Sequence, residues 1–204
     1  MAGTRHAHTR KPPQQQRSEE MVDRIIDAGA RILLRYGYDG ASTNKIASEA
    51  GVSPGSLYYY FSDKDGVLRA VLDRFLKNLG TAVTTRTSGA TKLDRAAFIA
   101  AADTLITLLE ENRRYLEVLI NEAPRLVSPD SRESVEQRLH DHMRLGFLLA
   151  GSTLTGAELE ARCWLATQLC LAVPVKYVLT HGPIPRDLFL EGLADQVDAL
   201  AGLA

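Results

Sequence analysis

The chain has 204 residues, of which 45% are hydrophobic, and its formal net charge is -1. This length allows one substantial core or a small module beside a larger one, and two cysteines are too few for a disulfide framework. We find neither a membrane span nor the apolar segment of a signal peptide, and therefore expect a cytoplasmic protein that does not associate with a membrane.

The apolar residues recur at spacings of three and four from residue 18 to the end of the chain, which predicts an all-α fold of about nine helices. The first helix carries an apolar stripe that ends at Tyr36, and Gly37 stops it. Two short helices follow at about 43–50 and 54–61. A longer helix over residues 64–83 then fades into a polar stretch, residues 84–91, that is the best candidate for a boundary.

Three local signals place the sixth, seventh and eighth helices. Pro124 closes a sixth helix that follows a fifth one. Ser128 provides a cap, with a proline in the next position, for a seventh helix. The spacing from Thr155 to Glu158 is that of a capping box and opens an eighth helix, which ends near Thr180. The fifth, sixth, seventh and ninth helices are expected at about 97–108, 115–120, 129–147 and 189–200.

Residues 42–61 have the pattern of a helix pair that reads DNA. Ser42 can cap the first helix, and Ser53 can cap the second, whose first residue is Pro54. Gly51 permits the left-handed backbone of a sharp turn between them, and Val52 fills the corner. The residues expected to face inward are Ile46, Ala47, Ala50, Leu57 and Phe61. The outward side chains are small or carry hydroxyl groups, which suits close approach to bases and hydrogen bonds to phosphate.

At these residues the chain resembles the helix-turn-helix of TetR/AcrR-type regulators. The resemblance is strong over residues 18–72 and architectural beyond them. It is carried by Ser42, Ile46-Ala47, Ala50 to Ser53, Gly55, Leu57-Tyr58, Phe61 and Lys64. The DNA-contacting set that it implies is Thr43, Asn44, Ser53, Pro54, Gly55, Ser56, Tyr58, Tyr59, Tyr60 and Lys64. Tyr60 departs from the family pattern, since many members have histidine at this position.

The resemblance also implies a domain organisation. A helix-turn-helix DNA-binding domain over residues 18–63 precedes a helical ligand-binding and dimerisation domain over residues 64–204, and the last two helices pair two subunits into a homodimer. Residues 1–17 hold four cations and no acid, whereas the remaining residues hold 20 cations and 25 acids. We interpret residues 1–17 as a flexible basic arm, either one that enters the minor groove or a solvated tail.

Polar residues interrupt the apolar faces of the C-terminal helices, which is typical of a small-ligand cavity and also of the edge of an ordinary helical core. The candidate ligand-binding residues are Tyr115, Asn121, Glu122, His140, Met143, Phe147, Trp164 and Gln168. Pro174 is expected to kink the eighth helix.

Catalytic and metal chemistry find no support in the sequence. Cys163 and Cys170 have no further ligand at metal-binding spacing, and His140 and His142 point in different directions on one helix. We therefore expect no enzyme activity, no cofactor and no metal.

The resulting hypothesis is a repressor that leaves a palindromic double-stranded DNA operator when a small apolar or amphipathic effector binds. Two alternatives stay open. One is a ligand-independent architectural DNA-binding protein, and the other is a small-molecule carrier or enzyme that uses the helical domain.

Overall fold

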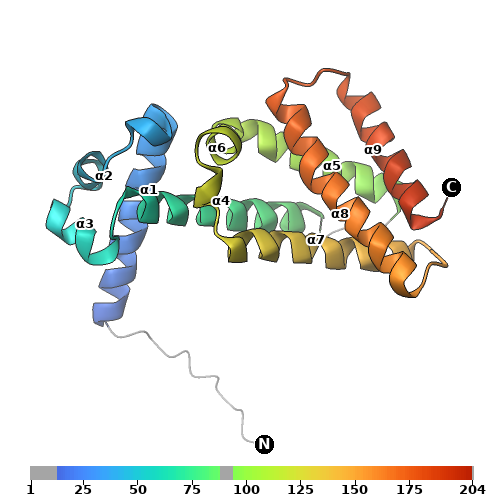
Figure 1. Cartoon of the computed structure of the whole chain (residues 1–204), viewed down its shortest axis with the longest axis horizontal. Helices are drawn as coiled ribbons and strands as arrows, with labels where there is room; N and C mark the ends of the chain where they lie inside the picture. The colour runs from blue at the N-terminus through green and yellow to red at the C-terminus, as the bar shows by residue number, and fades with distance from the viewer. Residues whose placement is uncertain (1–12, 88–93, 204) are drawn as a thin grey trace, which may run out of the picture. The chain divides into compact units, whose positions relative to one another are not determined.

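A computed structural model describes residues 13–87 and 94–203 of the chain, with side chains over 16–81 and 94–203 (Figure 1). The described residues form nine α-helices, one π-helical turn and one 3-10 turn, without a strand. The all-α prediction is confirmed. Two compact units divide the chain after Val71, inside α4 (Lys64–Thr87), so that this helix belongs to both units.

The first unit is built around α1 (Pro13–Gly40), α2 (Thr43–Ala50), α3 (Pro54–Tyr60) and the first turns of α4. Ile25, Leu33, Ile46 and Leu57 are completely buried and hold these helices together. Gly37 leaves the helical conformation at φ 69°, as predicted, because a residue without a Cβ adopts that backbone at little cost.

Two expectations for α1 differ from the structure. The helix begins at Pro13, so the last five residues of the expected basic arm lie in it, whereas Arg5, Arg10 and Lys11 lie outside the described residues. Tyr36, placed on the inner stripe by its spacing, is instead 47% exposed. Its ring lies 4.6 Å from Lys45 Nζ, a cation–π contact that keeps the ring at the surface.

The second unit contains the end of α4, α5 (Arg95–Glu111), α6 (Arg113–Glu117), α7 (Pro129–Leu149), α8 (Gly156–Leu179) and α9 (Arg186–Ala201). Ser128 caps α7 through its hydroxyl, as predicted, but the Thr155 side chain makes no capping hydrogen bond to α8. The predicted sixth helix is shorter than expected. A π-helical turn, η1 (Val118–Glu122), and a 3-10 turn, η2 (Pro124–Leu126), follow α6.

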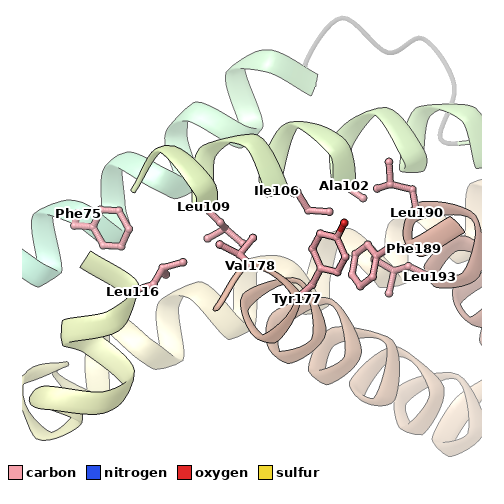
Figure 2. Packing of buried hydrophobic residues seen from close by; sticks show 10 residues of the cluster. All are labelled: Phe75, Ala102, Ile106, Leu109, Leu116, Tyr177, Val178, Phe189, Leu190 and Leu193. Carbon is pink, nitrogen blue, oxygen red and sulfur yellow. The ribbon is translucent and has the colours of Figure 1, made fainter. Parts of the chain in front are cut away.

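Two apolar clusters form the core of this unit. The larger one joins α4, α5, α6, α8 and α9, and Figure 2 shows its ten buried members. Within it the rings of Tyr177 and Phe189 stack with centroids 4.1 Å apart, and the Tyr177 hydroxyl donates a hydrogen bond to the Ile184 carbonyl. The smaller cluster joins α7, α8 and α9 and includes Met143, Phe147 and both cysteines.

Candidate nucleic-acid interface and ligand pocket

The turn between α2 and α3 is built from local capping contacts. The Ser42 hydroxyl accepts a hydrogen bond from the Lys45 amide, and the Ser53 hydroxyl accepts one from the Ser56 amide at 3.0 Å. Gly51 occupies the left-handed region at φ 65°. Each of these features was predicted from the sequence, and together they orient α3 against α2.

The inner face of the pair fixes which side of α3 points outward. Leu57 is completely buried, and Ile46 and Ala47 are 0% and 1% exposed on α2. The opposite side presents Tyr58 at 53% and Tyr59 at 81% exposure. Residues 53–55 and Asn44 are exposed as well, whereas Ser56, Tyr60 and Thr43 are half-buried. One edge of the first unit therefore gathers most of the residues that the resemblance assigned to DNA.

Hydroxyl groups on this edge are paired with one another. Thr43 Oγ1 and the Tyr58 hydroxyl share a hydrogen bond of 3.0 Å between α2 and α3, and the Ser53 and Ser56 hydroxyls share one of 2.8 Å. The Tyr59 and Tyr60 rings meet edge to face with centroids 4.9 Å apart. These contacts restrict the rotamers of Tyr58 and Tyr59, so less conformational entropy is lost when the side chains bind a partner.

Lys64, at the start of α4, is held against the end of α1. Its Nζ donates to the Tyr38 carbonyl at 3.1 Å and lies 4.1 Å from the centroid of the Tyr38 ring. The Tyr38 hydroxyl donates to Asp65 at 2.8 Å. Tyr38 could not be recognised from the sequence, because its partners lie 26 and 27 residues away and no local pattern connects them.

Lys45 was not among the predicted site residues, unlike Lys64. Lys45 Nζ donates to the Gly40 carbonyl at 2.7 Å, which ties the first turn of α2 to the end of α1. Within residues 42–61, Lys45 is the single cation and Glu49 the single acid, and Glu49 is paired with Arg31. The single carboxylate within residues 42–61 is therefore paired with a cation. This pairing favours the approach of a polyanion to the edge formed by α2 and α3.

The eight candidate ligand residues do not come together. His140 and Trp164 line a pocket of about 780 Å³ between α7 and α8. Tyr115 instead stacks on Phe75 in the larger core cluster, and Met143 and Phe147 belong to the smaller one. Gln168 donates to Glu136, Glu122 pairs with Arg114, and Asn121 is exposed.

The pocket is also lined by three carboxylates that were not among the predicted residues, those of Glu133, Glu136 and Glu160. Charged residues on a helix resemble an ordinary solvated face until a neighbouring helix is placed beside them.

The described residues contain no group of three or more histidine, cysteine, aspartate or glutamate side chains arranged to hold a metal ion. Cys163 and Cys170 are both free thiols and buried. Burial raises the pKa of the Cys170 thiol to about 12, so the thiol is neutral near pH 7.

Comparison with known proteins finds a match within the first unit. Residues 25–71 match the family model for bacterial regulatory proteins of the tetR family. Over this segment, the chain is similar to bacterial regulatory proteins of the tetR family. The matched segment contains α2, α3 and the turn between them, so it includes every exposed tyrosine of the edge described above.

Curated relatives resemble this chain over part of its length. The HTH-type transcriptional regulator BetI of Burkholderia mallei (strain NCTC 10229) is 36% identical over 72 residues, which is 35% of this chain and 37% of BetI. BetI of Burkholderia cenocepacia (strain HI2424) matches with the same identity and coverage. The chain thus spans little more than a third of the length of these relatives.

Solved structures of bacterial regulators share the fold along most of the chain. A putative TetR-family regulator from Mesorhizobium loti MAFF303099 superposes with a TM-score of 0.66 at 21% identity, covering 92% of this chain and 98% of the other. The fatty acid degradation regulator FadR from Bacillus halodurans gives 0.64 at 17% identity, with 93% and 96% coverage. At these identities the likeness shows the fold alone. Among the described residues, no helix is long and apolar enough to span a bilayer.

Proposed function

We propose that this chain is a cytoplasmic, ligand-responsive transcriptional repressor that binds a palindromic operator as a homodimer and leaves it when a small amphipathic effector binds. The observation that carries the proposal is the edge formed by α2 and α3. Tyr58 and Tyr59 stand exposed there beside small residues that let a helix approach base edges closely.

DNA contact follows from the geometry of this edge. In the proposed complex α3 lies in the major groove, with Gly55 and Ser56 near the bases and the tyrosine hydroxyls on phosphate oxygens. Thr43 and Asn44 begin α2, where unpaired backbone N–H groups can also receive a phosphate. Lys64, held by Tyr38, supplies a cation near the end of α3.

The dimer is proposed to form through α8 and α9. Leu165 and Val173 on α8 and Leu188 on α9 are 48%, 36% and 62% exposed in the isolated chain. A Cβ added to Gly192 of α9 would meet nothing within 4 Å, so a partner helix can approach closely there. Two recognition helices would then reach half-sites about 34–36 Å apart.

We propose that α4 couples effector binding to release from DNA. This helix begins in the unit that carries α2 and α3 and ends in the unit that carries the pocket. An effector that shifts α4 changes the separation of the two recognition helices, so that both half-sites no longer fit at once. The two binding events are then coupled through one continuous element.

Selection of duplexes from a random library with the full chain, followed by fluorescence anisotropy over a salt series, tests the proposal. We expect a palindromic site with two half-sites about one helical turn apart. Lys64→Ala weakens binding to all sequences and lowers the salt slope by about 2 for two subunits. Lys77→Ala, an exposed lysine of α4 in the second unit, is the matched control and leaves the slope unchanged.

Two outcomes would overturn the proposal. If no duplex is enriched, the chain does not read a sequence. If an operator is bound but no small molecule changes its affinity, an architectural DNA-binding protein is the better description.

A further inference from the structure

The pocket between α7 and α8 has a composition that differs from that of the apolar cores. Three carboxylates line it, from Glu133 and Glu136 on α7 and Glu160 on α8. Arg132 is the one guanidinium among the residues that line the pocket, and His140 lies between the carboxylates in the sequence. With a neutral histidine the lining carries a net charge of -2, which disfavours an anionic ligand.

The three carboxylates differ in the number of hydrogen bonds that they accept from other side chains. Glu160 accepts hydrogen bonds from His140 Nε2 at 3.1 Å and from Arg144 Nε at 2.9 Å. Glu136 accepts from Gln168 through Oε1 alone. Glu133 has no hydrogen bond or ion pair to the described residues and is exposed. Acceptor oxygens of Glu133 and Glu136 are therefore open to a ligand in the pocket.

An aromatic ring stands beside these carboxylates. Trp164 is 53% exposed and lies four residues after Glu160, on the same face of α8. A large aromatic side chain that is half exposed at a pocket offers its face to a ligand. Among the aromatic side chains, the negative face of indole attracts an organic cation most strongly. Carboxylates and an indole face together select for positive charge on an apolar body.

We propose that the pocket of α7 and α8 binds an organic monocation with a short apolar chain, and that such a cation is the effector of this regulator. The effector role rests on the proposed function above, whereas binding in the pocket does not. The positive head lies between Trp164 and the oxygens of Glu133 and Glu136, and the apolar chain lies against Val127 and Pro129.

The chain itself contains the reporter for this binding. Trp164 is the single tryptophan among the 204 residues, so tryptophan emission from the full chain reports this pocket and no other site. We choose hexyltrimethylammonium as the probe, because it does not absorb at the excitation wavelength. Hexanoate and 1-hexanol keep the apolar chain and replace the cation by an anion or a neutral hydroxyl.

We expect a saturable change in emission with hexyltrimethylammonium and none with hexanoate. The double variant Glu133→Gln with Glu136→Gln binds about tenfold more weakly, since two charges are lost while the glutamine carbonyl still accepts from Gln168. Glu111→Gln, an exposed glutamate of α5 away from the pocket, is the matched control and leaves binding unchanged. Trp164→Phe, followed by calorimetry, weakens binding by about two- to fivefold.

The inference is wrong if hexanoate or hexanol changes the emission as strongly as the cation, or if the double variant binds the cation as well as the native chain does. The operator assay separates it from the proposed function. Operator binding that persists unchanged at saturating cation removes the effector role and leaves DNA binding intact. Absence of any operator complex removes the proposed function, while the emission titration still decides what the pocket binds.

Discussion

Gly29 of α1 faces Val67 and Val71 of α4 without room for a side chain. A Cβ at this position would lie 2.7 Å from Val67 Cγ1 and 3.2 Å from Val71 Cγ2, and both valines are almost fully buried. We predict that Gly29→Ala lowers the free energy of unfolding, because overpacking costs about 1–3 kcal/mol and the gain in helix propensity is at most about 1 kcal/mol. Urea unfolding followed by circular dichroism measures the change.

Gly146 in the last turn of α7 is the matched control for Gly29, since a Cβ there meets nothing within 4 Å. Gly146→Ala is expected to stabilise the protein by about 0.5–1 kcal/mol. Equal effects of the two substitutions would contradict the close packing of α1 on α4.

The two thiols provide a prediction on pH. Burial raises the pKa of Cys163 and raises that of Cys170 to about 12, from an ordinary value of 9.0. Neither thiol should react with Ellman's reagent at pH 8 in the native protein, and both should react in urea. Above pH 9 the unfolded chain loses thiol protons that the folded chain keeps, so stability falls as the pH rises. Rapid native labelling of Cys170 would contradict its burial.

Residues whose role depends on near neighbours were predictable from the sequence. Ser42, Gly51 and Ser53 act through hydrogen bonds or backbone angles within three residues of their own positions, which is what a local pattern encodes. Tyr38 and Lys64 meet across 26 residues, and only the fold brings them together. Tyr36 was assigned to the inner stripe because spacing alone does not reveal the cation of α2 that contacts its ring.

Helices α5 and α9 are joined at both ends by arginines. Arg95 at the start of α5 contacts Glu191, Asp195 and Asp198 of α9. Arg186 at the start of α9 contacts Asp103, Thr107 and Glu110 of α5. Each guanidinium thus binds several acceptors at once. Its planar group with several N–H donors suits this arrangement better than the ammonium group of a lysine would.

We predict that Arg186→Met lowers the melting temperature measurably, because Asp103 and Glu110 of α5 lose the cation that α9 provides while the methylene chain is kept. Arg114→Met is the control, since its partners Glu117 and Glu122 follow it in the same segment and such exposed pairs contribute little. Thermal unfolding at low and high salt measures both. A loss for Arg114→Met as large as that for Arg186→Met would argue against the role of Arg186 in joining α5 to α9.

The helices were predictable where the spacing of apolar residues and the residues that cap or end a helix define them. The starts of α7 and α8 were recognised from Ser128 and Thr155, although the Thr155 side chain does not form the expected cap. The turn at η1 was not foreseen. It contains a hydrogen bond from the Ala123 amide to the Val118 carbonyl, one residue wider than in an α-helix, and an apolar stripe does not record one extra residue.

At the scale of the whole molecule, the pocket was the least predictable feature. The sequence placed polar residues near apolar faces, but which of them share a cavity depends on how α7 and α8 pack. His140 and Trp164 share the pocket, whereas Met143, one turn further along α7 than His140, points into a core. A spacing rule cannot make this distinction until the helices are placed.

The proposed dimer gives the last prediction. Leu188 of α9 is 62% exposed, and a carboxylate in its place would be buried without a partner in an α8–α9 interface, which is costly. We predict that Leu188→Glu sediments as a monomer and binds the operator on the order of a hundredfold more weakly, since each subunit then holds a single half-site. Sedimentation velocity and anisotropy measure the two effects, and circular dichroism verifies that the monomer is folded. Leu149→Glu, at 65% exposure on α7, should remain a dimer. A dimeric Leu188→Glu protein, or equal dissociation by Leu149→Glu, would place the subunit interface elsewhere.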